Sequence, residues 1–426
     1  MKARSSAAHR CSIVLPHARD MPSQRRNLRL FLGSQAASQS GTWLQFVALA
    51  WLAAELTGSG VALGWITVAT FGPLLVLGPL TGAVADRMDK HRLLIGTQAL
   101  VVGQAVALGA VILTGAPSMA LVYGLATAFG LLHAVENPVR RALLAEVVDA
   151  NAIPRAVSFN GSITAAGRIV GPVAAGALIA SAGIGWCFIA VAVSYVVALS
   201  ALLLIQRNAL HMTVAVREPG AVRAGLRYAW SVPDLRVALM LTAVVATFGF
   251  NHQVLIPLLA EHTFGGGVGA YTLLYVAIGV GSVFGALTVA RCDKIDVRFL
   301  AGAVVAFAVA NGLIALAPNL TVAVIACAAT GAAGSLLITA AIALLQQRCA
   351  PAMRCRVMAL SAMVIVGGLP IGGPIVGVVA DVAGPRAGVA VGSVAAVAAA
   401  ALVARHLPQR GTGTGRVEES SLTYAS

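Results

Sequence analysis

The sequence predicts an all-α membrane protein, with twelve transmembrane helices arranged as two pseudo-symmetric halves of six. Three observations support this fold class: 59% of the 426 residues are hydrophobic, 10% are charged, and the basic residues gather in every second gap between apolar stretches. Soluble domains carry about a quarter charged residues, so the composition excludes a soluble fold. With a window of about 20 residues, the length that spans a bilayer, the apolar stretches run near 29–54, 61–85, 93–114, 118–137, 156–180, 184–205, 237–258, 268–290, 299–317, 320–344, 357–380 and 384–404.

The distribution of Lys and Arg predicts the orientation in the membrane. If both termini and the gaps after even-numbered stretches lie on one side, that side holds all 29 Lys and Arg except Arg168 and Arg386. Basic loops face the cytoplasm, so we expect a multi-pass protein of the cell inner (cytoplasmic) membrane with both termini in the cytoplasm. The net charge of +14 is spread through short loops beside anionic lipid, which predicts the lipid bilayer and no nucleic acid as a partner.

The two halves repeat each other around a polar interior segment. Gly171-Pro172 in the fifth stretch corresponds to Gly373-Pro374 in the eleventh. Two such halves, related by an axis along the membrane normal, place a binding site between them at the midplane. We therefore expect a disordered basic tail (1–27, with Met21 an alternative to Met1 as the start), an N-terminal half (28–206), a linker that is either a short amphipathic helix or an ordinary charged segment (207–235), a C-terminal half (236–406) and a disordered tail (407–426).

The loop after the second stretch carries a charged motif, Gly82-Ala-Val-Ala-Asp86-Arg87-Met-Asp89-Lys90-His91-Arg92. It resembles the loop between helices two and three of the major facilitator superfamily, which implies the major facilitator fold. Asp89 stands where the family has a glycine. The resemblance implies a gating latch on the cytoplasmic side, in which Asp86 meets the positive N-terminus of helix eleven and Lys90 pairs with an acid ending helix four. Solvated loop charges are the alternative interpretation of the latch residues Gly82, Asp86, Arg87, Lys90 and Glu146.

The fifth stretch contains Gly167-Arg-Ile-Val-Gly171-Pro172-Val-Ala-Ala-Gly176. This resembles the G-x-x-x-G-P-x-x-x-G element of the drug antiporters in the same superfamily. Small residues four apart let two helices approach closely, and proline bends a helix. We expect that a bent and tightly packed seam between the halves prevents protons from leaking through the protein.

Three further segments look like the exporter branch of the superfamily, which includes enterobactin-exporter-like, macrolide-efflux and antibiotic-cluster transporters. They begin at Gly41-Thr-Trp43-Leu-Gln45, at Asn137-Pro138 and at Ala350-Pro351, and the resemblance covers roughly residues 28–405. It implies a monomeric secondary active exporter, a proton-coupled antiporter, of bulky amphiphilic small molecules such as antibiotics, other natural products or siderophores. The small-molecule substrate and protons are then its partners.

Arg168 is the basic residue inside an apolar stretch, about 18 Å past the start of the fifth span. A cation in lipid is costly, so we expect it to face a cavity or a partner. If helix four continues past Pro138, Glu136 is the best partner. If Asn137-Pro138 instead begin a new helix, Glu136 is an interfacial cap and Arg168 binds substrate or backbone carbonyls. His133, one turn from Glu136, is either a proton relay or a hydrogen-bonded bystander.

Other polar and aromatic residues are candidates for the substrate cavity, with polar packing between helices as the alternative: Gln35, Gln39, Trp43, Gln45, Asn251, His252 and Gln253. The sequence has no P-loop, no nucleophile–base pair and no metal-spaced cluster. We therefore expect no enzymatic activity, no metal site and no cofactor, with the proton gradient as the energy source. Two other functions stay open: an importer or facilitator of a small polar nutrient, and a membrane enzyme or sensor that borrows the fold.

Overall fold

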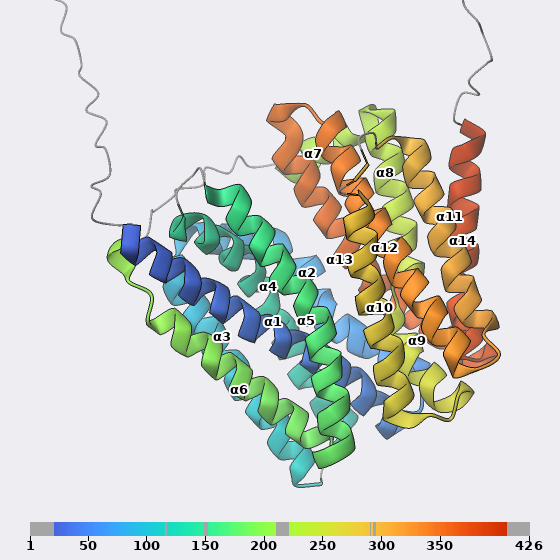
Figure 1. Ribbon diagram of the computed structural model, residues 1–426, viewed down its shortest axis with the longest axis horizontal. Helices are drawn as coiled ribbons and strands as arrows, with labels where there is room; N and C mark the ends of the chain where they lie inside the picture. Colours follow the sequence, from blue (N-terminus) through green and yellow to red (C-terminus); the bar gives the residue numbers. More distant parts are fainter. Residues whose placement is uncertain are drawn as a thin grey trace, which may run out of the picture.

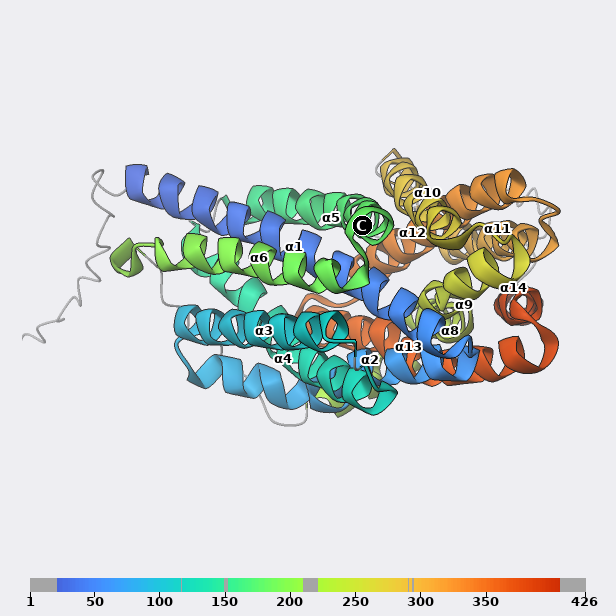
Figure 2. The same cartoon turned by 90° about the horizontal axis from the view of Figure 1, so that it is seen from below.

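The structure, a computed structural model, describes residues 21–115, 117–148, 152–209, 221–289, 291–292 and 295–406. The described residues are helical, without a strand, and form two bundles that lie side by side (Figures 1 and 2). The first bundle, blue to green in Figure 1, contains α1 (Met21–Thr57), α2 (Gly60–Arg87), α3 (Lys90–Leu113), α4 (Met119–Val147), α5 (Ile153–Ala182) and α6 (Ile184–Leu203). The second contains α8 (Pro233–Val244), α9 (His252–Leu258), α10 (Gly267–Val289), α11 (Val297–Leu316), α12 (Leu320–Arg348), α13 (Arg354–Ala383) and α14 (Pro385–His406).

Eleven helical segments in the described part of the chain are long and apolar enough to cross a membrane. One of them, Pro233–Thr263, contains α8 and α9, with a π-helical turn between them (Val245–Gly249) and a second π-helical turn after α9 (Leu259–Thr263). Of the long helices, α1 is outside this group, because glutamines and serines interrupt its apolar residues, and it packs inside the first bundle against α5 and α6. With α1 included, the expected all-α membrane fold is confirmed.

Side chains at the helix starts explain where several helices begin. Ser59, Asp89, Ser118, Asp296 and Asn319 each accept a hydrogen bond from the backbone N–H three residues later, which satisfies a donor that has no partner within the helix.

Glycines make the tight turns at corresponding places in the two bundles. Gly183 connects α5 to α6 with φ 93°, and Gly384 connects α13 to α14 with φ 88°. A side chain at these dihedral angles would be strained. The same turn therefore ends the fifth helix of each half.

Helix contacts between the bundles follow the same symmetry. α2 packs against α13, and α5 packs against α10. Exchanging the two halves maps α2 onto α10 and α13 onto α5, so one kind of contact is used twice. Two pseudo-symmetric halves joined through such a pair of contacts form the expected architecture.

The buried apolar side chains show that the halves join at one end. The largest cluster combines both halves and includes Trp51 of α1, Tyr271 of α10 and Val376 of α13. Two further clusters lie nearer the end that carries Met21 and His406. One, around Leu143 and Phe31, belongs to the first half, and the other, around Leu344 and Val357, belongs to the second half. The bundles are thus joined on the outer face, defined here as the face opposite Met21 and His406, and have separate cores toward the inner face.

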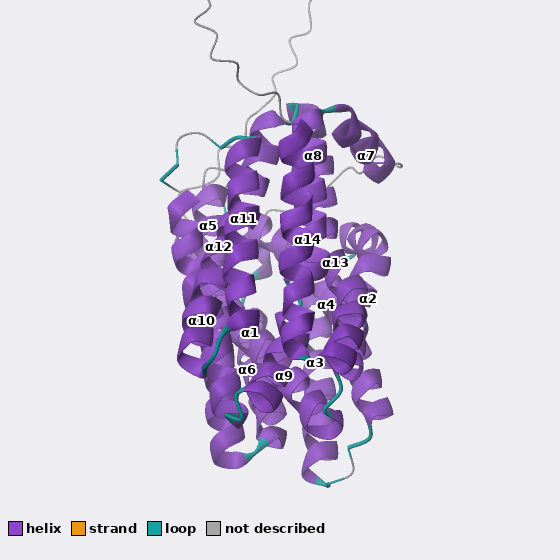
Figure 3. Cartoon of the chain, turned by 90° about the vertical axis from the view of Figure 1, so that its right-hand side faces the viewer, coloured by secondary structure: helices purple, strands orange, loops and turns teal. Residues whose placement is uncertain are grey.

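A short helix, α7 (Ala221–Ser231), lies within the linker beside α8 at the inner end (Figure 3). Ala229 is buried, whereas Leu226, Trp230, Arg223 and Arg227 are exposed. The helix also contacts α13. Its exposed apolar and basic side chains match an amphipathic helix at a membrane surface.

Candidate functional site

Glycines bring α2 and α13 into backbone contact at the outer end of the seam between the halves. A Cβ at Gly60 would lie 2.5 Å from the carbonyl oxygen of Gly377, and a Cβ at Gly64 would lie 2.7 Å from the Cα of Pro374. Real Cβ atoms do not come this close, so these positions require glycine in the observed packing. The contact closes the outer end of the seam on one side.

Asp381, near the end of α13, joins the same two helices by capping the start of α2. Its carboxylate accepts hydrogen bonds from the backbone N–H of Gly60 at 2.5 Å, the hydroxyl of Ser59 at 2.7 Å and the backbone N–H of Val61 at 3.1 Å. The negative charge lies at the positive N-terminus of a helix, where it is stabilising. Asp381 is therefore a polar link between the halves at the outer face.

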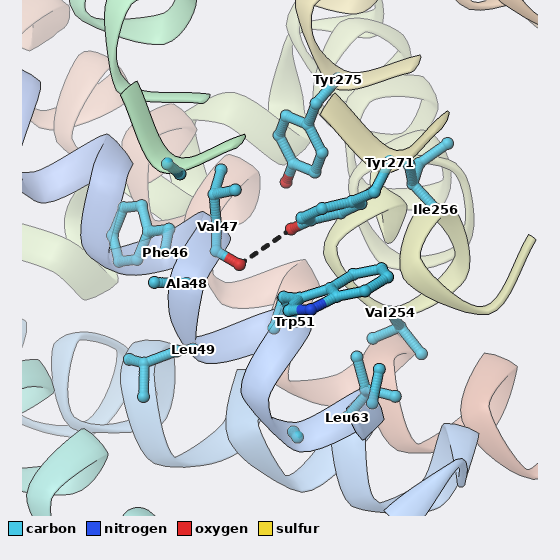
Figure 4. Packing of buried hydrophobic residues seen from close by; sticks show 14 of the residues in the cluster. Phe46, Val47, Ala48, Leu49, Trp51, Leu63, Val254, Ile256, Tyr271 and Tyr275 are labelled. Atoms are coloured by element: carbon cyan, nitrogen blue, oxygen red, sulfur yellow. Dashed lines mark hydrogen bonds between the residues drawn. The ribbon is translucent and has the colours of Figure 1, made fainter. Parts of the chain in front are cut away.

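Aromatic side chains close the other side of the seam, between the first half and α10. The Tyr271 hydroxyl donates to the carbonyl oxygen of Val47 at 3.0 Å, and the Trp51 ring stacks on Tyr271 with centroids 5.2 Å apart (Figure 4). Gly176 faces Thr272 so closely that a Cβ would overlap its side chain. This second contact completes the closure of the outer face.

The glycine–proline element in α5 serves two contacts. A Cβ at Gly167 would lie 3.3 Å from Gln39, and a Cβ at Gly171 would lie 2.5 Å from the Cβ of Trp43. These two glycines pack α5 on α1, whereas Gly176 packs it on α10 in the other half. Pro172 lies inside α5, which continues through it. The element thus lies at the seam, and its role against proton leak stays a prediction.

The charged motif lies at the inner end of the first half. Lys90 Nζ lies 2.5 Å from Glu146 Oε1, and both side chains are buried. The expected ion pair is present, and it links the start of α3 to the end of α4. Gly82, Asp86 and Arg87 belong to α2, but their side chains lie outside the described residues, so the contact of Asp86 with the eleventh span stays a prediction.

Asp89, which replaces the family's glycine, caps α3. Its carboxylate accepts from the Arg92 backbone N–H at 3.0 Å and lies 3.9 Å from Arg207 Nη1. Partial burial raises the pKa of Asp89, but the hydrogen bond from Arg92 and the charges of Arg207, His91 and Arg92 outweigh it and hold the pKa below its ordinary value. Arg207 also donates to His91 Nδ1 at 3.1 Å, so the loop ties α3 to the residues after α6.

Arg168 lies on α5 at the seam and stacks on Trp43, with its guanidinium carbon 5.1 Å from the ring centroid. Its side chain is exposed. The contact with Trp43 of α1 and the approach of Gly279 of α10 to the Arg168 backbone place this cation at the seam between the halves. The predicted ion pair with Glu136 is wrong, because Glu136 pairs elsewhere.

Glu136 is fully buried in the first half and pairs with Arg140, one turn further along α4. Gln98 Nε2 donates to the same carboxylate at 3.3 Å, and His133 Nδ1 lies 3.8 Å from it. α4 runs unbroken through Pro138, so the alternative in which Asn137-Pro138 begin a new helix is also wrong. Because the helix continues, Arg140 lies in the buried interior, and it forms the ion pair with Glu136 that was predicted for Arg168.

Several polar atoms of this cluster have no hydrogen-bond partner among the described residues. They include Glu136 Oε2, His133 Nδ1 and Gln98 Oε1. Buried polar groups are normally satisfied, so the cluster has acceptor and donor capacity left for a proton or a water molecule.

The candidate cavity residues of α1 divide into two groups. Gln35 and Gln45 are fully buried, and Gln45 donates to the Gln104 side chain at 3.0 Å, which is polar packing between α1 and α3. Gln39 and Trp43 are half-buried and face α5. Of the four, only these two lie beside α5 near Arg168 in this conformation.

The seventh span places its three polar residues differently. Asn251 is buried and donates to the backbone oxygen of Thr247 at 2.6 Å, beside the first π-helical turn. His252 and Gln253 are half-buried.

Four functional candidates were missed by sequence reasoning: Arg140, Tyr271, Tyr275 and Asp381. Arg140 follows a proline, a pattern that favours the end of a helix. The tyrosines and the aspartate belong to no motif, although Asp381 is an acid next to the end of an apolar stretch, a position suited to capping a neighbouring helix.

Two six-helix bundles that meet at one face define a membrane transporter of the major facilitator fold. It is not an enzyme. Residues 22–415 match the model of the family described as transmembrane secretion effectors, and the chain belongs to this family.

Known proteins agree with this class. The chain is 25% identical over 269 residues to the staphyloferrin A transporter of Staphylococcus aureus (strain NCTC 8325 / PS 47), a match that covers 62% of this chain and 67% of the relative. It is 26% identical over 231 residues to the uncharacterized MFS-type transporter YfiS of Bacillus subtilis (strain 168), covering 52% and 53%. A crystal structure of a bacterial homologue of the human lysosomal transporter Spinster, inward-facing and unoccupied, has a TM-score of 0.71 at 15% identity, covering 90% of this chain and 97% of that chain.

Proposed function

We propose that this transporter is a secondary active exporter, which carries bulky amphiphilic small molecules such as antibiotics, other natural products or siderophores out of the cell in exchange for protons. One observation carries the proposal: the cation Arg168 lies at the seam, whereas the buried acid, Glu136, lies inside the first half. In this proposal the substrate binds at the seam and the proton binds at Glu136, so that each can be exchanged for the other through the two arrangements of the halves. The family's description as secretion effectors supports the outward direction.

Alternating access follows from the two ends of the seam. In the closed outer face, Asp381 at the end of α13 caps α2. We propose that Asp86, at the end of α2, caps α13 in the reciprocal way when the inner face closes, and that the Lys90–Glu146 pair fixes the adjacent helix ends. Protonation of Glu136 removes the charge that binds Arg140, which biases the first half between its two arrangements.

The direct test is a susceptibility panel of antibiotics and siderophores in a host that lacks its own efflux pumps. Expression should lower the cellular content of at least one compound, and an uncoupler that collapses the proton gradient should abolish the effect. A nutrient importer or facilitator would instead raise the content of its substrate. A rise for a small polar nutrient, with no compound extruded, would overturn the proposal.

We propose that the protein works as a monomer in the inner membrane with both termini in the cytoplasm. Single-cysteine variants Asp89→Cys and Gly266→Cys, each in a background without native cysteines, test the orientation with a membrane-impermeant thiol reagent. Position 266 should react in intact cells and position 89 only in inverted vesicles. The reverse pattern would contradict the orientation and the direction of transport.

A further inference from the structure

Arg168 is a cation without an acidic partner in the part of the chain that the structure describes. The acid in the membrane interior, Glu136, is bound by Arg140, and none of the ion pairs between described side chains includes Arg168. An unpaired charge in the interior of a membrane protein is costly and marks a functional site.

Aromatic side chains from both halves surround this guanidinium. The Trp43 ring of α1 lies under it at 5.1 Å, and Tyr275 of α10 lies one turn before Gly279, which faces the Arg168 backbone. Three helices, α1, α5 and α10, thereby meet at this charge on the seam.

The seam also makes this arrangement sensitive to the transport cycle. A Cβ at Gly279, one turn beyond Tyr275, would lie 3.1 Å from the Arg168 carbonyl oxygen. α5 and α10 are thus in backbone contact at the site. Separation of the two helices would move Tyr275 away from Arg168 and change what the cation can bind.

We propose that Arg168, Trp43 and Tyr275 form a subsite for the carboxylate of an organic anion with a flat apolar body. The guanidinium fork matches a carboxylate with two parallel hydrogen bonds, and the phenol supplies a further donor. Trp43 holds the guanidinium plane by a cation–π contact, and the aromatic rings accept an apolar body. The inference rests on the proposed export function and names the class of its substrate.

Binding of a matched pair of probes to the purified full-length protein tests this subsite. 2-Naphthoate and 2-naphthamide share one ring system and differ in charge. We would measure their equilibrium binding in nanodiscs of neutral lipid for the wild type, Arg168→Gln, Arg168→Lys and the control Arg227→Gln, an exposed arginine of α7. Retained binding of 2-naphthamide and an unchanged thermal melt show that a variant is folded.

The wild type and the control should bind naphthoate about tenfold or more tightly than naphthamide, the ratio expected of charge-assisted hydrogen bonds. Arg168→Gln should abolish the preference, and Arg168→Lys should retain part of it because an ammonium lacks the fork. Equal binding of the two probes by the wild type, no binding of naphthoate, or a preference that survives in Arg168→Gln would each overturn the proposal.

A lipid headgroup is the other source of an anion, and nanodiscs containing phosphatidylglycerol test it. Loss of naphthoate binding in that lipid would assign the site to an anionic headgroup and overturn the assignment to a solute. Failure of the export proposal is a separate result, because these assays need neither a proton gradient nor transport. A protein that binds naphthoate through Arg168 but exports nothing contradicts export alone, and one that exports only neutral compounds contradicts the subsite alone.

Discussion

Replacing Asp381 with asparagine should shift the protein toward the arrangement that opens on the outer face. The carboxylate accepts three hydrogen bonds from the start of α2, at 2.5, 2.7 and 3.1 Å, and these cross from one half to the other. Asparagine keeps one acceptor oxygen but loses the charge. Because Asp381 is exposed, the lost interaction with the helix N-terminus is worth about 0.3–1 kcal/mol.

A change of about 1 kcal/mol corresponds to about a fivefold change in the ratio of two states. Pulsed electron–electron double resonance measures the distribution of distances between two spin labels, and hence that ratio. The labels are placed at the exposed outer positions Thr114 and Leu316, one in each half. Asp381→Asn should raise the long-distance population up to about fivefold.

The matched control for this experiment is Asp296→Asn. Asp296 is also exposed and caps a helix, α11, through the Phe299 backbone N–H at 2.8 Å, but that contact stays within one half. The control should leave the distance distribution unchanged. Identical distributions for Asp381→Asn and the wild type would refute the inference that Asp381 holds the outer face closed.

Three further substitutions test other parts of the structure. Glu136→Gln and Arg140→Gln each leave a buried partner unpaired, which costs about 3–5 kcal/mol, so each should lower the melting temperature more than the double variant does; additive losses would separate the two residues. Gly281→Ala directs a methyl group at the Ala328 backbone of α12, whereas Gly103→Ala meets open space; overpacking costs about 1–3 kcal/mol, and equal melting temperatures would contradict the close packing. Asp86→Asn should lower transport without abolishing expression, since the lost helix-terminus contact is worth about 0.3–1 kcal/mol; wild-type transport would indicate that the loop charges are only solvated.

The sequence predicts the helices well because the bilayer imposes a length and an apolar composition on each span. The helix bounds predicted from the sequence are less accurate, because the helices continue beyond the apolar stretches. The stretch 118–137 becomes Met119–Val147, which moves Arg140 from an expected loop into the buried interior. Proline and adjacent charge favour a helix end locally, but packing against α3 and the bond to Glu136 hold the helix together.

The site is predictable where a motif fixes both members of a contact, as for Lys90 and Glu146. It is not predictable where the partner comes from the other half without a pattern of its own. Trp43 is a candidate from the sequence, but its contact with Arg168 depends on how closely Gly171 brings α5 to α1. The cap of α2 by Asp381 depends likewise on backbone contact at Gly60.

Proton-coupled export is tested most directly in inverted membrane vesicles that are energised to an acidic interior and contain a dye quenched by that acidity. Addition of a compound identified by the susceptibility panel should relieve the quenching within vesicles that contain the wild-type protein, because the compound enters as protons leave. Vesicles without the protein should not respond. Uptake of the compound with no change in the interior acidity would contradict proton exchange, and absence of uptake would contradict export.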